Sequence, residues 1–343
     1  MDSILELIQN QCFIIAEAGV NHNGNINLAK KLVDKACEAG VDAIKFQTFK
    51  AENLVTKEAP KAEYQKNTTG NGSQFEMLKK LELSFEDHIS LKNYCTEKGI
   101  IFISTPFDFE SVDLLEKIDV PIYKVSSGDL TNLPLLKYIA NKNKPIILST
   151  GMANLGEVEE AVEAIYKIGN KNLILLHCTS NYPTAYEDVN LRAMVTMKEA
   201  FKLPIGYSDH TIGIEVPIAA VTLGAKVIEK HFTLDKAMDG PDHRASLEPD
   251  KLKMMVDGIR NIEKAMGDGI KSCNRSEENT KSVARKSIVA SRDIKKEEII
   301  TINDISFKRP EGGLRPKYLD LIIGKSATRD IYENEFIVFS DIK

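Results

Sequence analysis

The chain has 343 residues, of which 43% are hydrophobic and 28% are charged, a composition typical of a folded globular protein with a large core. Its formal net charge of -5 at pH 7 argues against the basic surface with which proteins bind nucleic acid or anionic membranes. No apolar run approaches the roughly 20 residues that span a bilayer, and Met1-Asp2-Ser3 lacks the basic start of a signal peptide. We therefore expect a cytoplasmic protein with no membrane or nucleic-acid partner.

Short β-rich runs alternate with helical patterns from residue 12 to about residue 266, which is typical of parallel βα units. Stretches such as 108–118 and 154–167 carry apolar residues at helical spacing and predict amphipathic helices. The predicted strands are 12–17, 42–47, 100–105, 122–127, 145–150, 173–178, 203–208 and 226–231. Eight strands, each followed by a helix, predict an α/β fold of the closed (β/α)₈ (TIM) barrel type. An open doubly wound sheet is the weaker alternative, because no Gly-rich dinucleotide turn follows any strand.

The chain also divides along its length. A long connection, 48–76, follows the second predicted strand, and connections of this length are usually functional or disordered. The polar run that follows Gly267-Asp268-Gly269 predicts a linker. From Val283 onward, short strand patterns and turn residues predict a small β-rich module. The expected domains are a barrel at 1–269, a linker at 270–282 and a β-rich domain at 283–343.

Polar side chains end nearly every predicted strand. The active site of a (β/α)₈ barrel lies at the carboxyl ends of its strands, so we expect these side chains to converge on one rim. In chain order they are Glu17, Lys45 with Gln47, Thr105, Lys124 with Ser126 and Ser127, Ser149 with Thr150, His177, Ser208 with His210, and Glu229 with His231. A single buried polar group is usually a satisfied core residue, whereas a whole rim of them needs partners and charge compensation. The rim is therefore the predicted active site.

The two lysines of this rim, Lys45 and Lys124, suit a phosphate and a carboxylate bound side by side. Ion pairing of either lysine with Glu17 or Glu229 is the structural alternative. Together, two cations and several hydroxyls favour a small dianion as ligand.

Two histidines, His210 and His231, end neighbouring strands and can share a divalent metal through imidazole nitrogens. A hydrogen-bonded structural histidine is the alternative for each, and nearby carboxylates such as Asp242 favour the metal. The charged segment 230–243 follows the last strand, and its position predicts a loop that closes over substrate.

Six segments carry a resemblance to a known family. They are 15–24 (IAEAGVNHNG), 45–48 (KFQT), 104–108 (STPFD), 148–152 (LSTGM), 206–210 (GYSDH) and 228–235 (IEKHFTLD). At these residues the sequence resembles the sialic acid synthases, which include N-acetylneuraminate synthase and its legionaminic and pseudaminic acid relatives. The tail, with Lys308-Arg309-Pro310, resembles the antifreeze-like (SAF) domain of such synthases.

The resemblance implies a (β/α)₈ barrel followed by a SAF domain, and a domain-swapped homodimer in which the tail of one subunit covers the barrel mouth of the other. It implies that phosphoenolpyruvate is held by Lys45, Thr105, Lys124, Ser127, Ser149 and Ser208. It further implies manganese or magnesium at His210 and His231, and an N-acetylated hexose near Glu17, Gln47, Tyr182, Asp242 and the partner subunit's Arg309. Many relatives carry an amide at the position of Ser180, whereas this chain has Asn181 one residue later.

The implied reaction joins phosphoenolpyruvate to open-chain N-acetylmannosamine or a close analogue, releasing phosphate and giving N-acetylneuraminate, with Glu17 as general base. Ala18 and Val20 fit legionaminic acid synthases equally well, which keeps 2,4-diacetamido-2,4,6-trideoxymannose as an alternative sugar beside N-acetylmannosamine 6-phosphate. An alternative of another enzyme class is a Schiff-base aldolase with Lys124 as nucleophile. A carbohydrate-binding or stress-protective protein, acting through the tail module, is disfavoured because a binding scaffold needs no such polar rim.

Overall fold

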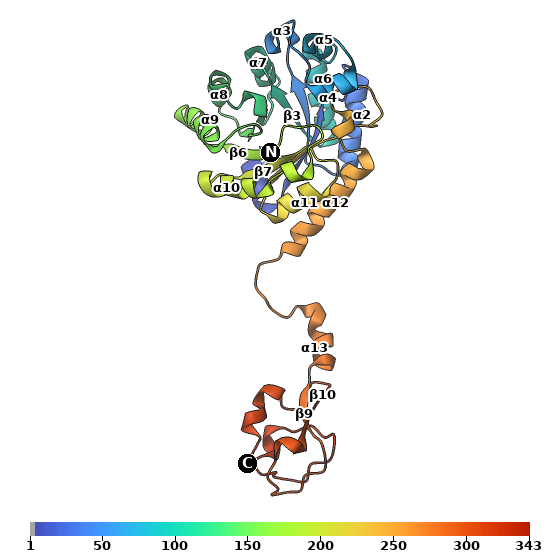
Figure 1. Ribbon diagram of the computed structural model, residues 1–343, viewed down its shortest axis with the longest axis vertical. Helices are drawn as coiled ribbons and strands as arrows, with labels where there is room; N and C mark the ends of the chain where they lie inside the picture. Colours follow the sequence, from blue (N-terminus) through green and yellow to red (C-terminus); the bar gives the residue numbers. More distant parts are fainter. Residues whose placement is uncertain (1–3) are drawn as a thin grey trace. The chain divides into compact units, whose positions relative to one another are not determined.

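The computed structural model describes residues 4–343, so Met1–Ser3, on which the argument against a signal peptide rests, lie outside the described residues. The chain forms two compact units, one that runs to Gly267 and a second at Asp268–Lys343 (Figure 1). No helix within residues 4–343 is long and apolar enough to cross a membrane.

Eight parallel strands close the first unit into a barrel, which confirms the predicted (β/α)₈ fold and excludes the open sheet. Each strand pairs with the next in the chain, and the last pairs with the first through contacts such as Glu17 with His231. The strands are β1 (Phe13–Gly19), β2 (Ala43–Thr48), β3 (Ile101–Pro106), β4 (Tyr123–Val125), β5 (Ile146–Ser149), β6 (Leu173–Cys178), β7 (Ile205–Asp209) and β8 (Val227–His231).

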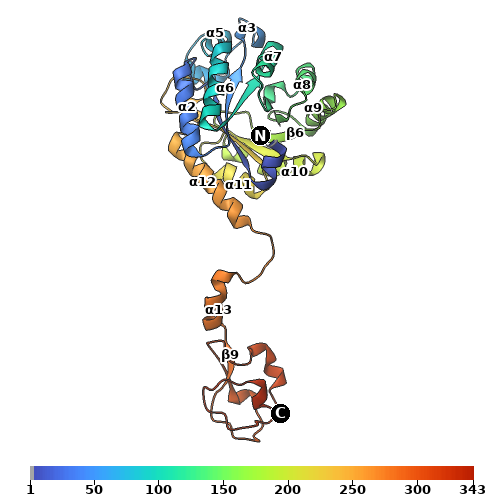
Figure 2. The ribbon, with the colours of Figure 1, turned by 180° about the vertical axis from the view of Figure 1, so that it is seen from behind.

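Amphipathic helices surround this barrel, as Figures 1 and 2 show from opposite sides. They are α2 (Ile26–Ala39), α6 (Phe85–Lys98), α7 (Phe109–Lys117), α8 (Leu133–Ala140), α9 (Leu155–Lys167), α10 (Leu191–Phe201), α11 (Glu215–Thr222) and α12 (Pro249–Met266). Local sequence fixes their ends: the Asn25 side chain accepts hydrogen bonds from the first turn of α2, and Gly40 ends that helix at φ 81°. Their buried faces and the outward faces of the strands form the main hydrophobic core.

The inward side chains change character along the strands. Alternate residues of a strand share one face, so positions two apart both point into the barrel. The successive inward pairs are Ile15 and Glu17, Ala43 and Lys45, Ile103 and Thr105, Ile122 and Lys124, Ile147 and Ser149, Leu176 and Cys178, Gly206 and Ser208, and Val227 and Glu229. The lower members other than Gly206 pack with Ile4 and Ile8 of α1 (Ile4–Asn10), a helix that the sequence analysis did not predict. The barrel thus has an apolar floor beneath a polar bowl.

Three short helices replace the expected long loop after β2. These are α3 (Ala51–Leu54), α4 (Glu63–Thr69) and α5 (Gln74–Lys79). The connection packs on a small apolar cluster in which its Phe49, Met77 and Leu81 meet Val20, from the turn after β1. It is therefore an ordered part of the first unit.

The second unit contains α13 (Glu278–Ala284) and an antiparallel pair formed by β9 (Ser287–Ala290) and β10 (Ile305–Lys308). Its apolar cluster includes Ile288, Ile300 and Ile337 and is drawn mainly from turns and isolated bridges. The small antiparallel β region agrees with the predicted β-rich tail, although α13 begins inside the stretch that the sequence predicted as linker.

We predict that Ile147→Ala lowers the free energy of unfolding by about 2–5 kcal/mol, because Ile147 is fully buried in the floor and its truncation leaves a cavity. Urea unfolding of the full-length protein measures the loss. Met254→Ala, at a side chain that is 50% exposed, is the matched control and shifts the free energy by less than about 0.5 kcal/mol. Equal, small shifts in both variants would contradict the buried position of the floor.

Candidate active site

The polar bowl opens into a cavity of about 460 Å³ at the carboxyl ends of the strands. The structure brings together there most of the residues that the sequence singled out: Glu17, Lys45, Gln47, Thr105, Lys124, Ser126, Ser127, Ser149, Tyr182, Ser208, His210, Glu229 and His231. Asp242 does not line the cavity, but its Oδ2 lies 3.9 Å from Nδ1 of His231. Arg309 belongs to the second unit.

Two strand ends were wrongly expected at this rim. The Thr150 hydroxyl donates to the backbone oxygen of Leu176, and Nε2 of His177 lies 2.8 Å from the backbone oxygen of Val189. Neither side chain lines the cavity, because each follows an inward residue by one position and so points to the other face. Both satisfy backbone groups instead.

Four buried charges occupy the bottom of the bowl. The Lys45 ammonium lies 2.6 Å from Glu17 Oε2 and 3.8 Å from Glu229 Oε2, and it donates to the Thr105 hydroxyl at 2.9 Å. The Lys124 ammonium lies 3.6 Å from Glu229 Oε1 and donates to Ser149 Oγ at 2.7 Å. The ion pairs expected as the structural alternative are therefore formed. Each lysine nevertheless has a hydroxyl beside it, a combination that suits a phosphate or carboxylate oxygen.

The two glutamates differ in their ionisation. Burial raises the pKa of Glu17 to about 7, although Lys45 opposes the shift. Burial also acts to raise the pKa of Glu229, but Lys124 and Lys45 outweigh it and hold that pKa at about 2. Near neutral pH Glu229 is therefore ionised and Glu17 titrates, while burial also lowers the pKa of Lys124.

The paired histidines fit a divalent cation. Nδ1 of His210 lies 2.7 Å from the backbone oxygen of Thr179, which can only accept, so Nδ1 carries the proton and Nε2 is left with a lone pair. The two imidazole centroids lie 5.4 Å apart, and buried Nδ1 of His231 has no hydrogen-bond partner. Burial lowers the pKa of both rings, which keeps them in the neutral form that binds metals.

Within residues 4–343, no group of three or more His, Cys, Asp or Glu side chains is arranged to hold a metal ion. A cation at His210 and His231 would therefore need further ligands from water or substrate oxygens. Open positions of this kind are typical of catalytic rather than structural metal centres.

An aromatic wall rises above the bowl. The Tyr182 ring lies 4.2 Å from the His210 ring and 5.2 Å from the Tyr64 ring, centroid to centroid. Tyr64 and Gln65 come from α4 and line the cavity, yet the sequence analysis did not single them out. Their only signal was the unusual length of the connection that carries them. Of the neighbours Ser180 and Asn181, the serine lines the cavity.

Lys61 closes the segment that carries Tyr64. Its ammonium is buried and lies 3.4, 3.0 and 3.4 Å from the backbone oxygens of Thr69, Gly70 and Asn71, at the carboxyl end of α4. A cation is favourable there because the last carbonyls of a helix lack partners within it. The segment 61–71 is thereby closed on itself.

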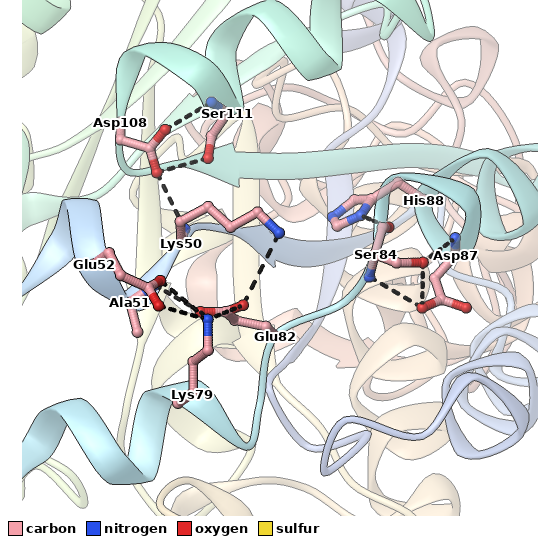
Figure 3. Close-up of polar contacts among 10 residues, drawn as sticks. All are labelled: Lys50, Ala51, Glu52, Lys79, Glu82, Ser84, Asp87, His88, Asp108 and Ser111. Carbon is pink, nitrogen blue, oxygen red and sulfur yellow. Dashed lines mark hydrogen bonds and ion pairs between the residues drawn. The ribbon is translucent and has the colours of Figure 1, made fainter.

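Figure 3 shows how the two ends of the connection are fastened to each other. Lys79 lies 2.7 Å from Glu52 and 3.3 Å from Glu82, and Glu82 accepts the backbone N–H of Ala51 at 2.7 Å. Asp108, which caps α7, accepts the backbone N–H of Lys50 and ties the same region to the turn after β3. These contacts hold the two ends of the connection together and anchor them to the barrel.

The fold and the bowl together define a barrel enzyme for a small anionic substrate. The chain belongs to the NeuB family, which matches residues 32–271, and a SAF domain matches residues 285–343. It is accordingly a nonulosonic acid synthase that condenses phosphoenolpyruvate with an acetylated sugar, in a family whose enzymes generally depend on a metal. This assignment takes precedence over the aldolase and binding-protein alternatives.

Similar proteins cover nearly the whole chain. The N,N'-diacetyllegionaminic acid synthase of Campylobacter jejuni is 55% identical over 94% of this chain and 98% of that protein. The N,N'-diacetyllegionaminic acid synthase of Legionella pneumophila is 48% identical, over 97% and 95% respectively. Among solved structures, the N-acetylneuraminic acid (sialic acid) synthetase of Leptospira borgpetersenii in complex with citrate matches with a TM-score of 0.70 and 38% identity, over 79% of this chain and 90% of that one.

We predict that Lys45→Met and Lys124→Met each weaken phosphoenolpyruvate binding about tenfold to a hundredfold, because each removes a charge-assisted contact of about 1.5–3 kcal/mol. Calorimetric titration measures the affinity. Lys167→Met, which breaks the exposed pair with Glu163, is the control and leaves binding unchanged. Wild-type affinity in both bowl variants would mean that the lysines are structural.

Proposed function

We propose that this protein is an N,N'-diacetyllegionaminic acid synthase, which condenses phosphoenolpyruvate with 2,4-diacetamido-2,4,6-trideoxymannose. The observation that carries the proposal is the 55% and 48% identity, over nearly full length, to two proteins of that name. The comparisons thus favour the alternative sugar of the sequence analysis over N-acetylmannosamine. Because phosphoenolpyruvate is an intermediate of central metabolism in the cytoplasm, we propose that the reaction takes place there.

The lining of the cavity supports a sugar without phosphate. Among the described residues that line it, the lysines are Lys45 and Lys124, both at the bottom of the bowl, and there is no arginine. A sugar 6-phosphate would bring a second dianion, for which this chain's own cavity lining offers no further lysine or arginine. The upper wall instead presents Tyr64, Tyr182 and Phe107, whose rings suit the methyl groups of a deoxy, acetamido sugar.

We assign the ligands in two layers. The lower layer holds phosphoenolpyruvate through Lys45, Thr105, Lys124, Ser127, Ser149 and Ser208. The upper layer holds the sugar through Gln47, Tyr182 and Asp242, with Arg309 supplied by the partner subunit of a domain-swapped dimer. His210 and His231 would hold manganese or magnesium, and such a cation acts as a Lewis acid on the sugar aldehyde.

Glu17 acts as the general base in this scheme. Its Oε2 lies 2.6 Å from the Lys45 ammonium and its Oε1 accepts from Gln47 Nε2 at 3.3 Å, so the carboxylate lies between the two layers. The enol carbon of phosphoenolpyruvate bonds to the aldehyde carbon, and positive charge develops at the neighbouring carbon. Glu17 stabilises that charge and takes a proton from the water that adds there, before phosphate leaves.

The deciding experiment measures phosphate release with phosphoenolpyruvate and three sugars side by side: the diacetamido-trideoxy hexose, N-acetylmannosamine and its 6-phosphate. We expect kcat/KM for the diacetamido sugar to exceed the other two by at least about a hundredfold, since unpaired polar groups penalise the wrong sugar. A higher kcat/KM with N-acetylmannosamine would refute the proposed specificity.

We predict that kcat/KM falls about tenfold per pH unit below pH 7, because Glu17, with a pKa of about 7, is then protonated and cannot accept a proton. Burial lowers the pKa values of His210 and His231, which moves their titration away from the step expected near pH 7. Rates measured from pH 5.5 to 8.5 test this. Glu17→Gln should lack the step and be nearly inactive throughout, whereas a flat wild-type profile would exclude Glu17 as the base.

Arg309 provides a test of the proposed dimer. Arg309→Ala should raise KM for the sugar and leave the affinity for phosphoenolpyruvate unchanged, because the guanidinium donates only to an acetamido carbonyl. At a sugar concentration well below the raised KM, Glu17→Gln protein mixed with Arg309→Ala protein should show more activity than either variant alone, since one of the two mouths then combines an intact barrel with an intact tail. No such gain despite proven subunit exchange would exclude a shared site.

A further inference from the structure

A fully buried ion pair lies directly behind the two histidines. In the register of β7 and β8, Asp209 pairs with Lys230, and these residues alternate with the cavity-lining residues Ser208, Glu229 and His231. The Lys230 ammonium lies 2.5 Å from Asp209 Oδ2, and both side chains have no exposed surface. The pair therefore occupies the outer face of the strands whose inner face bounds the cavity.

The turn around His210 completes this cluster. Asp209 accepts hydrogen bonds from the backbone N–H of Thr211 at 3.1 Å and from its hydroxyl at 2.9 Å. Lys230 donates in addition to the backbone oxygen of Thr211. The residues on both sides of His210 are thus tied to each other and to the residue that precedes His231.

Stability alone gives little reason for such an arrangement. Removing two charges from water costs several kcal/mol per ion, so a buried pair is often no more stable than apolar side chains of similar size. Apolar side chains cannot fix the position of a particular backbone group, because they form no hydrogen bonds to it. Asp209 and Lys230 fix the spacing between the end of β7 and the end of β8, from which both imidazoles project.

We propose that Asp209, Lys230 and Thr211 are positioning residues that hold His210 and His231 in the arrangement needed to bind a divalent cation. The inference rests on the metal role proposed for the two histidines. Thr179 orients the His210 ring through Nδ1, and the cluster sets the backbone positions from which both rings start. The cluster itself touches neither substrate nor metal.

The experiment titrates metal-stripped, full-length protein with Mn²⁺ and follows free Mn²⁺ by electron paramagnetic resonance. Wild-type protein should bind one ion per chain, and His210→Ala should lose it. If wild-type protein binds no ion, or His210→Ala binds equally well, the metal role of the histidines fails, and the inference about the cluster is overturned with it.

Two sets of variants then test the cluster by itself. Thr211→Val removes one hydrogen bond to Asp209 at nearly constant volume and should weaken Mn²⁺ binding about tenfold, whereas Thr211→Ser keeps the hydroxyl and should restore affinity. The double variant Asp209→Asn, Lys230→Met removes the ion pair without leaving a lone buried charge and should weaken binding up to about a hundredfold.

Asp42→Asn is the control for a general loss of stability. Asp42 pairs with Arg260 at 2.8 Å, far along the strands from the histidines, and its variant should lower the melting temperature and leave Mn²⁺ affinity unchanged. Unchanged affinity in folded Thr211→Val protein would overturn the proposal even if the double variant fails to fold, because that substitution leaves the ion pair intact.

Discussion

Four charges buried at mid-height of the barrel constrain everything around them. Each charge would cost several kcal/mol if it were buried without a partner. The charges compensate one another because closure of the barrel brings β1, β2, β4 and β8 together around them. Lys45 reaches both Glu17 and Glu229, and Lys124 reaches Glu229. The same ion pairs make the two glutamates differ. Glu229 faces both lysines and stays ionised, whereas the pKa of Glu17 is raised to about 7.

The floor and the wall of the cavity have different physical origins. Below the charges, the apolar floor is part of the folding core, and Ile4 and Ile8 of α1 complete it from outside the strands. Above them, the wall comes from a connection that packs on a separate small apolar cluster and has its own fastenings. The strand ends hold the family's common substrate, phosphoenolpyruvate, in our proposal, and the wall meets the sugar that differs among relatives. Common chemistry and variable specificity are therefore carried by different parts of the chain.

The sequence predicted most of the barrel because each strand is a short apolar run bounded by polar residues. The strand predicted at 122–127 is too long. β4 ends at Val125 because a 3₁₀ turn begins at Ser127. The sequence analysis missed α1 and the helices after β2, which are too short to show a helical period. Among site residues, Thr150 and His177 were misplaced because the alternation of side chains along a strand was not applied near the strand ends. Tyr64 gave no local signal, since only tertiary contact with Tyr182 brings it to the cavity.

The way Lys61 closes its segment has an evolutionary consequence. Its three acceptors are backbone oxygens, which every amino acid provides, so the contacts made by Lys61 require no particular side chain at Thr69, Gly70 or Asn71. Gln65, Thr68 and Thr69 add side-chain hydrogen bonds inside the segment, so substitutions elsewhere in it can accumulate while the segment stays closed. A lineage can therefore explore new sugars by drift in this short segment while the polar strand ends stay under purifying selection, and the same segment is a suitable unit for exchange between relatives in the laboratory.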